Sequence, residues 1–526
     1  MSENLETSGV IIDNLPVGSN AIAVNAPFTS DDATRLAINS HQPTTGPVAW
    51  YEAHIQSEEG LNIMGGLFPS SPTIGVGFNE NLAWGATVNK PDLVDIFALT
   101  TNAKEPDKYL LDGRWRSFRE KTIKLKVKLF GFLPWQVKRK ALYTEHGPAI
   151  ETPHGIYAIR YAGMGEIKQI EQWLAMNKAT NFEEWLAALA QHTFASFNFV
   201  YSDKDGNIAF IHNSMTPVRI PGYNWHNYLP GDKSSLIWDS YISFEKLPMV
   251  INPSSGYLIS ANQSPFFVTS DKDNPDRKNY SNEDGFPTRM TNRAVRGLEL
   301  LSELDKIDEQ TFSAIKHDKK YSKNSRAYKY LEKAMLADLG DLNTQKHEIY
   351  ANAQTILKKW DLSTDKNNRG AALGTCIIGA EWLAEQQGEN PPDPSGELKR
   401  CTDLLLDKIG RIDPKWGEVN RHIRGEINVA LGGGPDTLRA IYGLGLEEKG
   451  YLTNIAGDGL YYLVSWDKDK KQNVLGIHQF GSATLDENSP HYADQALDFA
   501  NEILHDPLFD ANKRQQKLDR RYRPGQ

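Results

Sequence analysis

The feature that most constrains the fold of this 526-residue chain is a change of hydrophobic periodicity along its length. Up to about residue 299 the apolar residues come in short runs bounded by Gly, Asn and Pro, which is typical of strands and turns. Apolar residues then recur at helical spacing, and strand-like runs return near the end. Because the helical stretch interrupts a strand-rich chain, we predict an α+β fold with a helical insert at about 299–445.

Several elements are predicted individually. In Thr122–Phe130, apolar residues alternate with Lys, which predicts a half-buried strand with a solvated Lys face rather than a functional basic patch. Phe197–Tyr201 and Ile208–His212 flank a turn-rich segment and are expected to form a hairpin. Helices are expected over Ala327–Leu336, His347–Trp360, Leu373–Gln386 and His491 to about Leu504, and strands over Tyr461–Trp466 and Val474–Gln479.

Composition and charge exclude several classes of protein. The net charge of -9 argues against a nucleic-acid partner, because such a partner requires a basic surface. No apolar run approaches the length of a membrane span, so we expect no membrane partner. The first residues lack the basic start and apolar stretch of a secretory signal. Two cysteines, Cys376 and Cys401, allow at most one disulfide within the chain.

The common hydrolase and metalloenzyme motifs are missing. The sequence contains neither G-x-S-x-G nor H-E-x-x-H, and its 13 histidines show no metal-ligand spacing. The glycine-rich segment Gly432–Asp436 lacks the Lys-Ser/Thr of a phosphate-binding loop, so we interpret it as a tight loop before a helix at Thr437. Any activity must therefore come from a less common arrangement.

Four segments combine turn residues with polar groups at strand ends. Each has an ordinary structural explanation when taken alone, such as a turn, a buried histidine or a loop. They are Gly18-Ser19-Asn20-Ala21, Ser40-His41-Gln42-Pro43, Ala83-Trp84-Gly85-Ala86-Thr87-Val88-Asn89 and Ser260-Ala261-Asn262-Gln263-Ser264-Pro265.

Together and in this order, the four segments resemble the penicillin acylase family, which includes penicillin, cephalosporin, aculeacin and acyl-homoserine lactone acylases. The resemblance covers nearly the whole chain. Further segments similar to family landmarks are Trp50-Tyr51-Glu52-Ala53-His54, Asp92-Leu93-Val94-Asp95-Ile96-Phe97, Thr144-Glu145-His146-Gly147-Pro148, Asn252-Pro253-Ser254-Ser255-Gly256-Tyr257 and Ser489-Pro490-His491-Tyr492-Ala493-Asp494-Gln495.

The resemblance implies a four-layer αββα N-terminal-nucleophile (Ntn) hydrolase sandwich, with two antiparallel sheets between helices. Residues 1–18 would be the remnant of a spacer, and residues 19–526 the large-chain domain of an acylase. A small acylase chain is the expected partner, and the family points to a periplasmic or secreted protein.

By the same resemblance, the bond before Ser19 breaks and Ser19 becomes the amino-terminal nucleophile of an amidohydrolase. Its freed α-amino group would take the hydroxyl proton, since such amines have pKa values of about 7.7–8.0. The oxyanion of the tetrahedral intermediate would be bound by the backbone N–H of Val88 and the side-chain amide of Asn262. Water would then hydrolyse the acyl-enzyme.

Supporting roles also follow from the resemblance. His41 would orient the nucleophile or its amine. Arg289, with Arg293 as the alternative, would hold the Asn262 loop and the amino terminus by charge-assisted hydrogen bonds. No cofactor is expected for catalysis.

Structural calcium is a further expectation. The segment containing Asp92, Val94 and Asp95 resembles one that holds calcium in some family members. The two carboxylates and the Val94 carbonyl would supply the hard oxygen ligands that Ca²⁺ prefers. The alternative is that Asp92 and Asp95 are surface carboxylates at a strand end.

The expected substrates are N-acyl compounds such as an acyl-homoserine lactone, an acylated peptide or a β-lactam. The sequence departs from the family in having only 18 residues before Ser19, Ile22 where an aromatic residue is usual, and His478–Ser482 in place of a glycine-rich segment. A catalytically silent scaffold or binding form is therefore the competing hypothesis. A third, in which Ser2 is the working terminus, has no strand-forming sequence around it.

Overall fold

A computed structural model describes residues 18–340, 343–483, 485–518 and 520–523. The predicted spacer remnant, apart from Gly18, lies outside the described residues. Among the described residues, no helix has both the length and the apolar character needed to cross a membrane.

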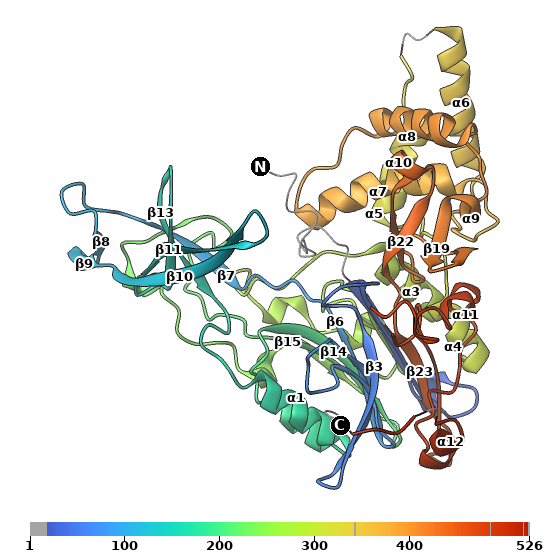
Figure 1. Ribbon diagram of the computed structural model, residues 1–526, viewed down its shortest axis with the longest axis horizontal. Coiled ribbons are helices and arrows are strands. Elements are labelled where there is room, and N and C mark those ends of the chain that lie inside the picture. Colours follow the sequence, from blue (N-terminus) through green and yellow to red (C-terminus); the bar gives the residue numbers. More distant parts are fainter. Residues whose placement is uncertain (1–17, 341–342, 484, 519, 524–526) are drawn as a thin grey trace.

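Two large sheets form the body of the molecule (Figure 1). The first has seven strands in the order β17-β15-β14-β6-β5-β4-β3, and each neighbouring pair is antiparallel. Its strands are β3 (Tyr51–Ser57), β4 (Leu61–Leu67), β5 (Val76–Phe78), β6 (Leu82–Thr87), β14 (Ser196–Asp203), β15 (Ile208–Ser214) and β17 (Met249–Ile251).

The second sheet has nine strands, with β1 between β18 and β2. Its pairs are antiparallel except for β19 with β22. Its strands are β1 (Gly18–Val24), β2 (Thr34–Pro43), β18 (Tyr257–Ser260), β19 (Asn420–Arg424), β20 (Ile427–Ala430), β21 (Ile441–Leu444), β22 (Leu452–Gly457), β23 (Tyr461–Trp466) and β24 (Gln472–Ile477).

The two faces of β1 pack into two different hydrophobic cores. Every residue of this strand is buried, and successive side chains of a strand point to opposite faces. Ala21 belongs to the core shared with the seven-stranded sheet, whereas Ile22 belongs to a second core on the other face. The two sheets approach closely at Gly85 of β6, where a Cβ would lie 3.1 Å from that of Ala21. A larger residue at Gly85 would push the sheets apart.

Helices cover the outer faces of both sheets. α1 (Gln169–Lys178) and α2 (Phe182–Leu189) add Met176 and Trp185 to the core of the seven-stranded sheet. α3 (Asn292–Ser302) and α4 (Glu309–Lys316) pack Leu301, Phe312 and Ile315 against the nine-stranded sheet. The α+β prediction is confirmed. The complete αββα order remains a prediction, and these packed faces support it.

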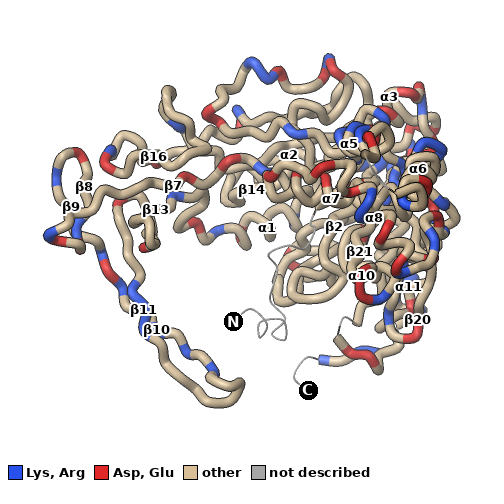
Figure 2. The backbone as a smooth tube through the Cα atoms, turned by 90° about the horizontal axis from the view of Figure 1, so that it is seen from above, with Lys and Arg blue, Asp and Glu red and all other residues tan. Residues whose placement is uncertain are grey.

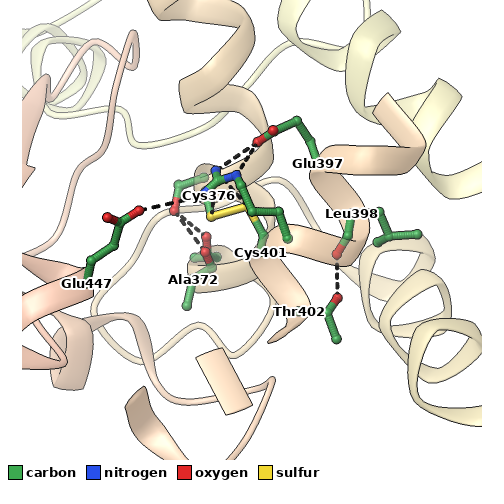
Figure 3. Close-up of a disulfide and its surroundings, with 10 residues drawn as sticks. Ala372, Cys376, Glu397, Leu398, Cys401, Thr402 and Glu447 are labelled. Carbon is green, nitrogen blue, oxygen red and sulfur yellow. Dashed lines mark hydrogen bonds and ion pairs between the residues drawn. A yellow bond between two sulfur atoms is a disulfide. The ribbon is translucent and has the colours of Figure 1, made fainter. Parts of the chain in front are cut away.

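A helical lobe with its own hydrophobic core lies at one end of the molecule (Figure 1). Its helices are α5 (Arg326–Leu336), α6 (Thr344–Lys359), α7 (Ala371–Gln387), α8 (Pro394–Ile409), α9 (Trp416–Val419) and α10 (Leu446–Lys449). A disulfide between Cys376 and Cys401 joins α7 to α8 (Figure 3). Strands β19, β20 and β21 lie within the segment that periodicity assigned to a helical insert.

A third sheet extends from the body in the order β10-β11-β12-β13-β7-β16. In it, β10 and β11 form a long two-stranded ribbon that reaches away from the rest of the chain (Figure 2). The bounds are β7 (Val94–Leu99), β10 (Arg119–Leu129), β11 (Leu133–Tyr143), β12 (Pro148–Thr152), β13 (Gly155–Tyr161) and β16 (Leu229–Pro230), with a separate pair β8 (Lys108–Leu111) and β9 (Arg114–Ser117).

Local predictions were confirmed except in three places. The segment Thr122–Phe130 is a strand, but it is exposed on both faces within the described chain instead of half-buried. The carboxy-terminal helix is short, α11 (Ala496–Asn501), and is followed by α12 (Ala511–Gln516). No helix begins at Thr437, because Gly434 and Thr437 bond to each other in a turn and Arg439 continues toward β21.

Candidate active site

Ser19 lies on β1, which runs between β18 and β2 of the nine-stranded sheet. Ser19 lies opposite Ser40 and Gly18 lies opposite His41, so the histidine is beside the Gly18–Ser19 bond. On the other side, Ala21 pairs with Ser260, the last residue of β18, and Asn262 follows two residues later. Ser19 is 2% exposed. Three segments far apart in sequence therefore meet at one buried serine.

The polar groups around Ser19 are bonded to one another. The Ser19 N–H donates to Asn262 Oδ1 at 2.8 Å, and the Ser19 hydroxyl contacts the carbonyl oxygen of Gly18. Asn262 Nδ2 donates to the carbonyl of Val88 at 2.8 Å. Asn262 has φ of 68°, a left-handed conformation that asparagine tolerates better than most residues. The two groups expected to bind an oxyanion, Val88 and Asn262, are thus adjacent.

The structure favours Arg293, the alternative arginine, over Arg289. Arg293 Nη1 donates to the Ser19 carbonyl at 2.6 Å, and its Nη2 donates to Asn262 Oδ1 at 2.8 Å. Its Nε donates to Asp436 Oδ1 at 2.9 Å. The side chain of Arg289 instead pairs with Glu385 on α7 at 2.8 Å, although its carbonyl accepts from the backbone N–H of Ser264. Arg289 lies four positions before Arg293, ahead of the start of α3 at Asn292.

His41 forms a buried pair with Asp458. Its Nε2 lies 3.1 Å from Asp458 Oδ1, and both side chains are fully buried. Asn39 Nδ2 donates to the same carboxylate oxygen at 2.8 Å. Because a carboxylate needs donors, we assign the imidazole proton to Nε2, which leaves the Nδ1 lone pair free. Among the described residues, Nδ1 has no hydrogen-bond partner.

The Nδ1 of His41 faces the junction. A Cβ added to Gly18 would lie 3.6 Å from it, 3.0 Å from Asn262 Oδ1 and 3.2 Å from Arg293 Nη2. Glycine therefore leaves room for these three polar groups to surround the bond before Ser19. Burial lowers the pKa of His41 to about 4, despite the opposing effect of Asp458. The imidazole is consequently neutral near neutral pH, which leaves Nδ1 unprotonated in the assigned tautomer.

Two cations hold Asp458 in its charged form. Lys316 Nζ lies 2.6 Å, and Arg439 Nη1 2.8 Å, from Asp458 Oδ2. Burial alone would raise the pKa of Asp458, but these two cations hold it well below its usual range. The carboxylate thus remains an acceptor that fixes the orientation of His41.

The proposed calcium ligands contact an arginine. The guanidinium of Arg219 lies 3.1 Å from Asp95 Oδ2 and 3.4 Å from Asp92 Oδ2. Val94, the first residue of β7, has a half-exposed side chain. Within the described part of the chain, no group of three or more His, Cys, Asp or Glu side chains is arranged to hold a metal. These residues therefore do not fit a calcium ion, because a fixed positive charge occupies the space between the carboxylates.

Several residues of the site were not recognised in the sequence. Asp436 lies 143 positions from Arg293, and Lys316 lies 142 positions from Asp458, whereas Arg439 lies 19 positions from Asp458. The sequence does contain one signal, since Asp436 ends the glycine-rich segment that was interpreted as a loop before a helix. That signal is an aspartate at the end of a glycine-rich loop, and the structure buries its side chain.

The chain is similar to known proteins in sequence and in fold. The Penicillin amidase family model matches residues 3–516. The chain is similar to the acyl-homoserine lactone acylase PvdQ of Pseudomonas syringae pv. tomato, with 23% identity over 90% of this chain and 65% of the relative. It is also similar to the penicillin G acylase of Escherichia coli, with 30% identity over 45% of this chain and 28% of the relative.

Among solved structures, the fold is similar to a thermostable penicillin G acylase from Alcaligenes faecalis. The TM-score is 0.67 at 17% sequence identity, and the match covers 96% of this chain and 99% of that one. The buried serine, the histidine and the asparagine of this chain lie on or next to one of two packed sheets, in a fold that is similar to that of this acylase. The chain belongs to the penicillin amidase family. It spans 65% of the length of the PvdQ relative.

Proposed function

We propose that the protein is an N-terminal serine amidohydrolase that cleaves the amide bond of N-acyl compounds. The observation that carries the proposal is the contact of Ser19 with Asn262, which in turn contacts Val88. Nucleophile, base and oxyanion donors must lie within hydrogen-bond reach of one another, and the contacts among Ser19, Asn262 and Val88 support this reading.

The first step is self-cleavage before Ser19. The Ser19 hydroxyl, which contacts the Gly18 carbonyl oxygen, attacks the carbonyl carbon as His41 Nδ1 accepts its proton. The peptide C–N bond breaks, the nitrogen receives a proton and an ester to Gly18 remains. Water hydrolyses this ester, releasing the Gly18 carboxylate and the free α-amine of Ser19. Arg293 holds the Ser19 carbonyl in place throughout.

The freed amine then serves as the base for amide hydrolysis. It remains near Asn262 Oδ1, which accepts from the same nitrogen in the uncut chain. The hydroxyl attacks the amide carbonyl of the substrate, the amine part leaves with a proton, and an acyl-enzyme forms. The Val88 N–H and Asn262 Nδ2 stabilise the oxyanion once Nδ2 exchanges its carbonyl partner for it. Water attack regenerates the serine.

The substrate class follows from the relatives. The names of two relatives include an acyl-homoserine lactone acylase and a penicillin G acylase, both of which act on N-acyl groups. We extend that class to this chain and leave the acyl length open. The competing hypothesis is a catalytically silent scaffold, which the substrate panel described below distinguishes from an enzyme.

A small acylase chain is the proposed partner. The ribbon of β10 and β11 carries an apolar face that the described chain leaves exposed, and a ribbon of two strands is marginal without further packing. Its opposite face is basic and suits solvent. The PvdQ relative has about a third of its length outside the match, which is room for a second chain.

The Cys376–Cys401 disulfide supports a periplasmic or secreted location. Disulfides form and persist in oxidising compartments and are rare in the cytosol.

The test is turnover of a panel of N-acyl substrates with increasing acyl length, using the full-length protein. We expect release of the free amine and a mass increase on Ser19 that corresponds to the acyl group. The control is Ser40→Ala, since Ser40 lies opposite Ser19 on β2 and its hydroxyl donates to the Ala86 carbonyl. Absence of amine release across the whole panel would favour the scaffold hypothesis.

A further inference from the structure

The guanidinium of Arg219 lies inside a cage of oxygen atoms. Its side chain has no exposed surface, and its Nε donates to Asp95 Oδ2 at 3.1 Å. Nη2 donates to the Asp92 carbonyl at 3.0 Å, and Nη1 donates to the Glu283 carbonyl at 3.1 Å. Two carboxylates and two backbone carbonyls therefore converge on one positive charge.

This set of oxygen atoms is the kind that normally binds a calcium ion. Calcium takes six to eight oxygen ligands, commonly carboxylates and carbonyls, at about 2.3–2.6 Å. Besides the four atoms in contact with Arg219, Asp95 Oδ1 is buried without a hydrogen-bond partner among the described residues. A cavity of about 110 Å³ lined by Asp92, Arg219 and Glu283 adjoins the cage.

We propose that Arg219 replaces a bound calcium ion at this site. Its charge neutralises Asp92 and Asp95, and its planar fork of donors satisfies oxygens that a metal would otherwise coordinate. The protein consequently needs no calcium for its stability.

The bonds of Arg219 join segments that lead to the active site. The Asp92–Asp95 segment follows β6 and Val88, and the loop containing Glu283 leads to α3 and Arg293. The two segments touch directly, since the Asp92 N–H donates to the Gly285 carbonyl at 2.9 Å. Gly285 has φ of 67°, and a Cβ there would lie 2.7 Å from the Cβ of Asp92. The two segments are therefore in direct contact beside Arg219.

The first experiment compares melting temperatures of the full-length wild-type protein with and without calcium. We use calcium at about 10 mM, roughly ten times the weakest dissociation constants of extracellular calcium modules. The melting temperature is expected to be equal in calcium and in EDTA. Terbium luminescence excited through tryptophan provides a second readout, because Trp238 Nε1 donates to Asp95 Oδ2 at 2.6 Å. No sensitised emission is expected.

The second experiment removes the positive charge of Arg219. Arg219→Ala should lower the melting temperature by several degrees, and calcium should restore part of that loss while EDTA abolishes the restoration. Arg219→Lys keeps the charge and should stay insensitive to calcium. The matched control is Arg296→Ala, which removes a two-bond ion pair with Asp318 and should destabilise without any calcium response.

Three results would decide against the proposal or for it. A calcium-induced rise in the wild-type melting temperature, or terbium emission from the wild type, would overturn the proposal. So would an Arg219→Ala protein that calcium affects no more than it affects Arg296→Ala. If Arg219→Ala does not fold, the wild-type terbium measurement decides alone.

Discussion

At the level of single residues, a small number of hydrogen bonds around Ser19 hold the groups of the proposed active site in position. Arg293 contacts both the carbonyl of Ser19 and the amide oxygen of Asn262, so one side chain would position the proposed nucleophile and the proposed oxyanion donor together. Asp458 acts indirectly, because it orients the ring of His41 without contacting Ser19. The site therefore depends on positioning groups as much as on the groups that react.

The two candidate arginines can be distinguished by conservative substitution. Arg293→Lys keeps the charge but cannot reproduce the forked contacts to Ser19 and Asn262, so kcat should fall by about tenfold to a hundredfold. Arg289→Lys should leave kcat near the wild-type value, because Arg289 pairs with Glu385 away from the serine. Steady-state kinetics checks both variants. Equal losses in the two would contradict the assignment.

The sequence predicted the residues that lie at strand ends better than those that reach the site from a distance. Ser19, His41 and Asn262 belong to segments with recognisable turn chemistry, and the structure brings them together. Asp458 carries no local pattern, and Asp436 shows only its place at the end of a glycine-rich loop, where an aspartate is usually solvated. Their role arises only when Arg293 and His41, far away in sequence, fold against them.

At the scale of elements, the ribbon of β10 and β11 is unusual in being amphipathic and exposed on both faces. Cross-strand pairs such as Val127 with Trp135 put apolar side chains on one face, and pairs such as Lys124 with Lys138 put lysines on the other. At the tip, Phe130 is 88% and Phe132 76% exposed. The alternation predicted the strand correctly. It could not show that the apolar face would lie outside the core of this chain.

If that apolar face binds the small acylase chain, substitutions on the two faces should differ. Val127→Ser combined with Trp135→Ser removes apolar area from one face and should weaken copurification of the two chains in the full-length protein. Lys124→Ser combined with Lys138→Ser alters the opposite face and should leave copurification unchanged. Size-exclusion chromatography of the processed protein measures this. Loss of the complex in the lysine variant alone would refute the proposed interface.

For the whole molecule, hydrophobic periodicity predicted the order of strands, then helices, then strands. The prediction succeeded because each of these parts is long enough to repeat its pattern of buried residues many times. The boundaries were less accurate, since β19, β20 and β21 are short strands inside a mostly helical segment. Six histidines are buried among the described residues, and burial lowers the pKa of each of them. They are His41, His146, His422 and His478, with pKa values of about 4, His212, with a pKa of about 3, and His317, whose pKa lies well below its usual range.

These buried histidines predict acid sensitivity. Their folded-state pKa values lie below the unfolded value of 6.5, so the unfolded chain binds more protons below that pH. The contribution of these histidines to the free energy of unfolding should have its full value above pH 6.5 and should fall as the pH drops toward 4. Each histidine contributes a slope of at most about 1.4 kcal/mol per pH unit. Urea unfolding at a series of pH values measures it; a flat profile from pH 7 to 5 would contradict the prediction.

The central claim is that Ser19 becomes the amino terminus of the working enzyme. It is tested most directly by intact-mass and amino-terminal analysis of the purified full-length protein and of its Ser19→Ala variant. The account predicts a large chain that begins at Ser19 in the wild type, and an uncut, inactive Ser19→Ala protein. Amide hydrolysis by a protein whose Gly18–Ser19 bond is intact would contradict it.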